Sequence, residues 1–165
     1  MRSRITASAV LVLALALLTS VAVASAATTK TRPFSAAYAG RAVVRATSDT
    51  SADINVTGAG KGALIGASKI AAVGAGSQGE PCATFSGKGT ITGKAGKLSF
   101  VLAPGAKACP TTANPDVSAL TASAKVTSGT GAYKGAKGLL KITGTYDKAT
   151  GKFASTFKGA LSTSK

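Results

Sequence analysis

From Phe34 onward, large apolar residues alternate with polar or charged residues in eight short segments. Leu98, Phe100 and Leu102 fall on one face of such a segment, whereas Lys97 falls on the other. Successive side chains of a β-strand point to opposite sides of the sheet, so this period of two predicts strands with one buried and one wet face. Beyond the N-terminal segment, no window of ten residues has a helical apolar period without an internal glycine or proline. The pattern predicts an all-β protein.

Glycine-rich turns separate these segments. Residues 147–151 begin with an aspartate and end with a glycine, the residue best suited to the positive φ of a tight reversal. Residues 57–62 and 92–97 are also glycine-rich and are predicted to be turns. The predicted strands cover residues 34–46, 51–57, 61–74, 82–92, 96–103, 118–127, 137–146 and 151–161.

The stretch 103–118 is too long for a hairpin connection and contains three prolines. Cys109 lies in its middle, and a bond to Cys82 would hold the stretch against the start of a strand. We therefore expect a lid that is pinned over one end of the molecule.

Eight strands with one apolar face form either a closed barrel or a sandwich. We favour a single antiparallel eight-stranded barrel, because closure leaves no unpaired sheet edge. The interior of such a barrel is just wide enough to be filled by side chains or to hold one small ligand. Its inward positions here include many glycines, alanines and serines. These fill space poorly, so we expect either a flattened barrel or a narrow cavity.

The N-terminus resembles a bacterial export signal. Arg2 and Arg4 precede an uncharged, mostly apolar run, and the small residues at 24–26 fit the rule for signal peptidase. The alternative is a membrane anchor, since about 20 apolar residues can span a bilayer. The central apolar run, 10–18, is short, and no basic cluster follows the segment directly. A secreted, soluble product without a membrane span is therefore predicted.

The predicted organisation has three parts. Residues 1–26 are the cleaved signal peptide, 27–33 a flexible leader, and 34–165 one β-barrel domain. The length of the last part fits a single domain.

Cys82 and Cys109 are the only two cysteines of the chain. In an oxidising compartment they pair most simply with each other. The bond would close a loop of about 28 residues, worth about 3–4 kcal/mol in the chain-entropy model. A metal site needs about four ligands, usually including histidine, and the chain has no histidine. A structural disulfide is predicted, with no metal and no cofactor.

The chain is strongly basic. Its net charge of +15 falls to +13 when Arg2 and Arg4 leave with the signal peptide, and the remaining cations are mostly lysines. Such a charge attracts polyanions, but it also simply keeps a secreted protein soluble and monomeric. Weak, salt-sensitive and unspecific polyanion contacts are assigned to outward-facing lysines on several strands: Lys88, Lys97, Lys125, Lys141, Lys152 and Lys158.

No catalytic group stands out. Without histidine the chain lacks the usual general base and the serine-nucleophile triad. None of the acidic residues falls at a predicted inward position. Among the aromatic residues, only Tyr133, in a turn, is predicted to be exposed for stacking on a base. The acidic residues are Asp49, Asp53, Glu80, Asp116 and Asp147.

The stretch 129–138, Gly-Thr-Gly-Ala-Tyr-Lys-Gly-Ala-Lys-Gly, resembles a motif of the allene oxide cyclase and dirigent-like β-barrel superfamily. The resemblance covers residues 128–161 and is greatest to small secreted bacterial members of unassigned activity. It implies an eight-stranded antiparallel barrel in which the motif forms a turn that re-enters the next strand. The plant members act on hydrophobic intermediates with polar and acidic pocket residues, and no such residue matches here.

Three functions are compatible with the sequence. The favoured hypothesis is a secreted, non-catalytic barrel that binds a small ligand or an extracellular surface partner. The second is a cyclase- or isomerase-like enzyme acting on a hydrophobic small molecule. The third is a cationic protein that binds anionic cell-envelope polymers or nucleic acid. A polar cavity would favour the second, and lysines gathered on one side would favour the third.

Overall fold

The computed structural model describes residues 29–77 and 81–164. In this part of the chain nearly every residue belongs to a strand or to a short turn between strands. The elements are β1 (Thr29–Ala46), β2 (Ser51–Gly62), β3 (Gly66–Ser77), β4 (Ala83–Gly93), β5 (Gly96–Leu102), β6 (Lys107–Pro110), β7 (Val117–Gly129), the 3₁₀ turn η1 (Gly131–Tyr133), β8 (Lys137–Asp147) and β9 (Lys152–Ser164).

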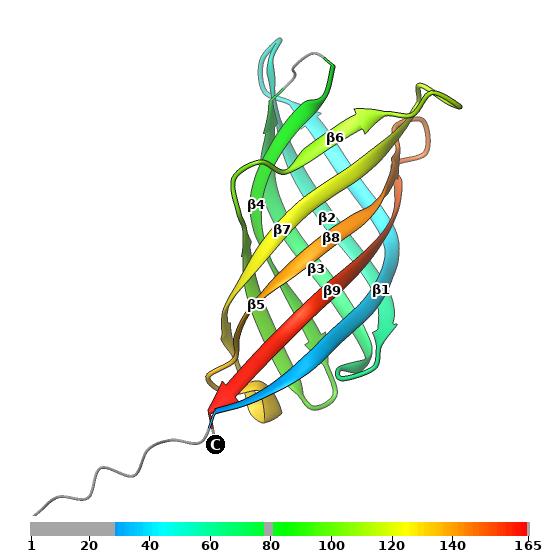
Figure 1. The fold of residues 1–165 in the computed structure, drawn as a ribbon. Helices are drawn as coiled ribbons and strands as arrows, with labels where there is room; N and C mark the ends of the chain where they lie inside the picture. Colours follow the sequence, from blue (N-terminus) through cyan, green and yellow to red (C-terminus); the bar gives the residue numbers. More distant parts are fainter. Residues whose placement is uncertain (1–28, 78–80, 165) are drawn as a thin grey trace, which may run out of the picture.

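The strands form a closed antiparallel barrel (Figure 1). The first strand pairs with both β2 and β9, and β3 pairs with β4. The circle is completed through β5, β7 and β8. The prediction of an all-β, eight-stranded antiparallel barrel is therefore confirmed, with β6 as one additional short strand. The predicted signal peptide, residues 1–26, lies outside the described residues.

The additional strand β6 prolongs the line of β5. Both pair with β4 on one side and β7 on the other. Pro104 and Gly105, the latter with a φ of 92°, interrupt the line only briefly. A lid was predicted over residues 103–118. This prediction is wrong for residues 107–110, because they belong to the barrel wall. Only residues 111–116 form a loop beyond it.

The stretch 57–62 was predicted to be a turn, and this is also wrong. These residues belong to β2, and the chain reverses at residues 63–65 instead. The glycines at 58, 60 and 62 occupy inward positions of the strand, opposite β1 and β3. Their function is to leave space for neighbouring side chains rather than to bend the chain.

The first strand begins earlier than the sequence predicts. Residues 29–33, predicted to be part of a flexible leader, form the beginning of β1 and pair with β9. The pairing with β2 starts only at Ala36, so β1 is paired on one side around Pro33. A proline is tolerated at such an edge because no second ladder needs its missing N–H.

The two ends of the barrel differ. The turns at residues 63–65 and 94–95, together with η1, surround what we call the closed end, at the bottom of Figure 1. Tyr133 of η1 is 4% exposed, and its hydroxyl donates a hydrogen bond to the Leu64 carbonyl at 2.9 Å. The opposite end, which carries the turns at 47–50 and 148–150 and the loop 111–116, is called the open end.

Candidate functional site

The barrel interior is filled at the closed end and hollow at the open end. Bulky inward side chains pack together near the closed end, among them Phe34, Ile91, Leu98, Leu140 and Leu161. The inward positions toward the open end instead carry many small residues, including Ala42, Ala52, Ala72, Gly74, Gly76, Gly87, Ala108, Ala122 and Gly144. Small side chains cannot meet across an eight-stranded barrel, so this half stays open.

The hollow is a cup of about 950 Å³. A volume of this size lies within the range of small-molecule sites, which is about 300–1,000 Å³. Every strand of the barrel contributes to its wall, and most of the lining is apolar. The larger apolar side chains are Ile54, Val56, Ile70, Phe85, Leu102, Leu120 and Ile142. Of the two expected outcomes, a flattened barrel or a narrow cavity, the structure has a cavity.

Aromatic side chains form the floor of the cup. Phe100 and Phe157 line it and contact each other edge to face, with ring centroids 5.7 Å apart. Below them Tyr38 packs against Phe157 at 5.6 Å, with the rings nearly perpendicular. The Tyr38 hydroxyl lies 2.9 Å from the Ser68 hydroxyl in a buried hydrogen bond. This bond pairs the two hydroxyl groups beneath the floor, at the boundary between the filled half and the cup.

One side of the cup carries hydroxyl groups. Ser118, Tyr146 and Ser155 line the cavity from the neighbouring strands β7, β8 and β9. Ser118 and Tyr146 are directly opposite each other in the strand register. Burial, and secondarily the charge of Asp147, raises the pKa of Tyr146 above its usual value. A phenol is neutral at physiological pH even with its usual pKa, and it can donate a hydrogen bond to a ligand.

The mouth of the cup is braced by the disulfide. Cys82 and Cys109 are bonded, with their Cα atoms 4.3 Å apart, so this prediction is confirmed. The bond joins the chain just before β4 to β6, next to the lining residues Pro81 and Ala108. It therefore fixes the short strand that completes the wall between β4 and β7. Asp49 and Lys148 are the charged residues of the turns at this mouth.

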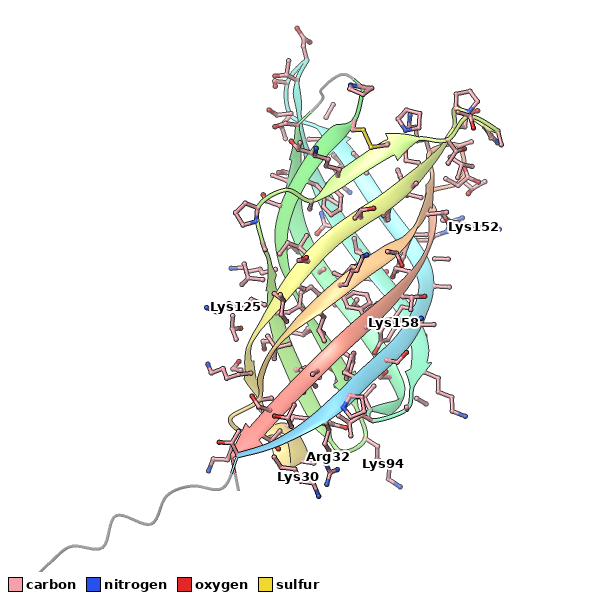
Figure 2. All side chains as sticks on the ribbon, in the orientation of Figure 1. Lys30, Arg32, Lys94, Lys125, Lys152 and Lys158 are labelled. Carbon is pink, nitrogen blue, oxygen red and sulfur yellow. A yellow bond between two sulfur atoms is a disulfide. The ribbon has the colours of Figure 1, made fainter. Side chains whose placement is uncertain are left out.

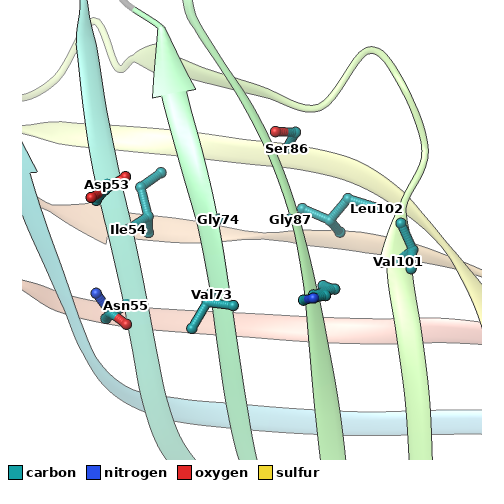
Figure 3. Close-up of a pocket in the computed structure, with 10 residues that line it drawn as sticks. Asp53, Ile54, Asn55, Val73, Gly74, Ser86, Gly87, Val101 and Leu102 are labelled. Carbon is teal, nitrogen blue, oxygen red and sulfur yellow. The ribbon is translucent and has the colours of Figure 1, made fainter. Parts of the chain in front are cut away.

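A second hollow of about 620 Å³ lies on the outer face of β2 to β5 (Figure 3). Val73 and Val101 are half exposed there, at 50% and 44%. It shares Gly74 and Gly87 with the cup. These two glycines pair directly, so the wall between the two hollows is backbone alone at this point. We take the inner cup as the candidate site because it is deeper and enclosed by all strands.

The lysines predicted to face outward are all exposed. They lie on several strands, as predicted, and only Lys141 and Lys158 are direct neighbours in the register. Figure 2 shows Lys125, Lys152 and Lys158 distributed along the wall. Of the six, Lys88 alone is among the residues that line the cup, and it is exposed on the outer side of β4 beside Gly87. The arrangement of Lys88, Lys97, Lys125, Lys141, Lys152 and Lys158 does not form one site.

The acidic residues do not converge on a reaction centre. Asp49 is at the mouth of the cup, and Asp53 lines the outer hollow. Asp147 accepts hydrogen bonds from the backbone N–H groups of Ala149 and Thr150, at 2.9 and 3.1 Å, within its turn. In the described part of the chain no group of three or more metal-ligating residues comes together. Glu80 lies outside the described residues.

The prediction that Tyr133 is exposed is wrong, because its ring covers the closed end of the core. The motif around it explains this: Gly131 and Gly135 have φ values of 60° and 72° and turn the chain back under the barrel. The turn re-enters β8, as the resemblance implies. Ser118, Tyr146 and Ser155 were not predicted to form a group. Their inward positions were readable from the period of two, but their proximity depends on the register of three strands.

The comparisons with known proteins add no family. No protein-family model matches the chain, and neither a curated protein nor a solved structure matches it. Among the described residues, no helix is long and apolar enough to cross a membrane.

Proposed function

We propose that this protein is a secreted, non-catalytic barrel that binds a small apolar molecule in its open cup. The observation that carries the proposal is the division of the interior, filled at one end and hollow at the other. A protein that needed only a stable core gains from filling this space, because each buried apolar group adds stability. The small residues around the cup give up that stability and leave room for a ligand.

The lining supports an apolar ligand with one polar group. Most of the wall and the aromatic floor would contact a hydrocarbon or an aromatic ring. The hydroxyls of Ser118, Tyr146 and Ser155 lie on one side, where they would bond a carbonyl, ether or hydroxyl oxygen. A neutral polar group fits better than a charged one there, since the charged residues of the lining, Asp49, Lys88 and Lys148, are all exposed to solvent rather than buried in the cup.

Kinship with the allene oxide cyclase and dirigent-like barrels is part of the proposal. It is supported by the turn at residues 129–138 and by the eight-stranded architecture. A cyclase-like reaction is the second candidate, and its polar groups would have to be the same three hydroxyls. We favour binding, because the pKa of the Tyr146 phenol is raised further from neutrality, and such a group orients a ligand more readily than it moves the ligand's protons.

A pair of matched variants tests the proposal. Ala42 and Ala39 lie on the same strand, but Ala42 lines the cup and Ala39 is exposed on the outside. The exported protein and its A42F and A39F variants are titrated with the neutral fluorophore N-phenylnaphthylamine. We expect wild type and A39F to bind alike and A42F to bind at least about tenfold more weakly, because a phenyl ring occupies the cup.

Urea unfolding of both variants shows whether each one is folded. A folded A42F variant that binds the fluorophore as tightly as A39F would refute the proposal, and so would a wild-type protein that does not bind it. If the wild-type protein binds the fluorophore and also converts a hydrophobic epoxide, the result would instead support the cyclase- or isomerase-like enzyme.

A further inference from the structure

Charge is distributed unevenly between the two ends of the barrel. The closed end carries a group of cations that we call the basic end. They come from the start of β1, from both sides of the turns at 63–65 and 94–95, and from the segment around η1. The residues of the basic end are Lys30, Arg32, Lys61, Lys69, Lys94, Lys97, Lys134 and Lys137.

No acidic residue in the described part of the chain lies at the basic end. Asp49, Asp53, Asp116 and Asp147 are all in or next to the turns of the open end. There they accompany cations such as Arg45, which is directly opposite Asp53 in the register. The positive charge of the protein is therefore concentrated at the end away from the cup mouth, and the open end is close to neutral.

The cations of the basic end come from several strands around the closed end of the barrel. Lys94 lies in a turn and Lys134 beside η1, and Figure 2 shows Lys30, Arg32 and Lys94 projecting from this end. Charges arranged around the end of a barrel can approach a plane together. A single extended polymer would reach only some of them. The shape therefore favours a flat anionic surface.

The side chains of the basic end also argue against nucleic acid. The aromatic residues of that end, Phe34 and Tyr133, are buried and cannot stack on a base. Lysine dominates over arginine, and lysine offers a point charge without the planar fork suited to bidentate recognition. The exposed large apolar residues lie on strands rather than in the turns of this end; Leu139, on β8, is two residues after Lys137 and faces outward from the wall. The turns of the basic end therefore support electrostatic contact with a partner, without insertion of apolar side chains.

We propose that the basic end docks the protein onto an anionic lipid surface and holds the cup mouth away from it. Each lysine or arginine near such a surface strengthens binding by roughly fivefold. Several acting together produce measurable binding at moderate ionic strength, which weakens steeply as salt screens the charges. The ligand cup would then open toward the medium rather than toward the membrane.

The test uses two double variants with the same change in net charge. K94E/K134E alters the basic end, whereas K125E/K141E alters exposed lysines in the middle of the wall. The exported protein and both variants are sedimented with vesicles of phosphatidylcholine, with or without phosphatidylglycerol. We expect wild type to bind only the anionic vesicles, K94E/K134E to lose roughly a hundredfold in affinity and K125E/K141E to lose less than about tenfold.

Three results would overturn this inference. Equal losses in the two double variants would mean that affinity follows net charge without a docking face. Absence of binding to the anionic vesicles would exclude lipid as the partner. Binding to inorganic polyphosphate or DNA that exceeds binding to vesicles would identify a polymer instead. The A42F variant, with a blocked cup, should bind vesicles like wild type, so failure of the cup proposal and failure of this one are distinguishable.

Discussion

Glycine at an inward position decides how closely an aromatic ring can approach the neighbouring strand. A Cβ added at Gly58 would lie 2.9 Å from Cζ of Phe153 and 2.6 Å from the Ala39 carbonyl oxygen. A Cβ at Gly60 would lie 2.7 Å from Cδ1 of Tyr38. At Gly76, beside the open cup, the nearest atom would be Cδ1 of Ile54 at 3.2 Å, the end of a flexible side chain. Glycine thus permits close packing at positions 58 and 60, whereas position 76 has room for a small side chain.

This difference predicts opposite outcomes for one substitution. Gly58→Ala should lower the free energy of unfolding by about 1–3 kcal/mol, because backbone and ring must both move. Gly76→Ala should leave it unchanged within about 0.5 kcal/mol or raise it slightly, since alanine restricts the unfolded chain. Urea unfolding followed by circular dichroism measures both. Equal destabilisation of the two variants would contradict this account of the glycines.

Burial should delay ionisation of all the tyrosines. Desolvation raises the pKa of Tyr38, Tyr133 and Tyr146 above the usual 10.0. The unfolded chain therefore releases these protons first, so their contribution to stability is complete below about pH 10 and is lost as the pH rises further. A titration of tyrosinate absorbance should have a higher midpoint in the native protein than in the same protein in concentrated urea. Coincident curves would show that the rings are not buried.

At the scale of elements, the weak point of the barrel is the interruption between β5 and β6. The wall resumes after it with only four residues, Lys107–Pro110. Two adjacent register pairs hold these residues to β4, and four hold them to β7. The disulfide between Cys82 and Cys109 adds a covalent link on the side where the pairing is shortest.

Removal of the disulfide should therefore loosen β6 more than the rest of the barrel. The double variant Cys82→Ala, Cys109→Ala should lose about 3–4 kcal/mol of unfolding free energy while the barrel still forms. Amide exchange in β6 should accelerate more than exchange in β2, which is paired along its whole length. Added reductant should destabilise the wild type and have no effect on the double variant. An unchanged urea midpoint in the variant would refute the stabilising role.

At the scale of the whole molecule, the concentration of cations at the closed end has a cost in stability. Like charges on one cap repel each other, and this repulsion acts against the compact state. It is strongest at low ionic strength, where the Debye length is about 30 Å at 0.01 M salt, and weak at 1 M, where it is about 3 Å.

Thermal unfolding should show this repulsion. Added sodium chloride should raise the melting temperature of the wild type by a few degrees. K94E should melt higher than wild type at low salt, and the difference should disappear at high salt. A variant that binds anionic vesicles less but melts higher has not lost binding through unfolding. A melting temperature that falls with salt would contradict the repulsion.

Local pattern alone determined most of the strands and their inward and outward faces. Leu98 and Phe100 face inward because of a period set by neighbouring residues, and the turn at Asp147–Gly151 needs only its own side chains. The pairing of Cys82 with Cys109 followed from there being no other cysteine. Closure into a barrel followed from the cost of free sheet edges.

Only the tertiary structure decided what depends on contacts between distant segments. Gly58 and Gly60 look like turn residues until Phe153 and Tyr38 lie over them, and residues 29–33 are a strand only because β9 is beside them. The register places many small inward residues at one end, where the cup forms, and it places Tyr146 opposite Ser118. It also brings cations from five separate stretches of the chain to the closed end. A sequence pattern repeats along the strand, but where its members meet depends on how far each strand is shifted against the next.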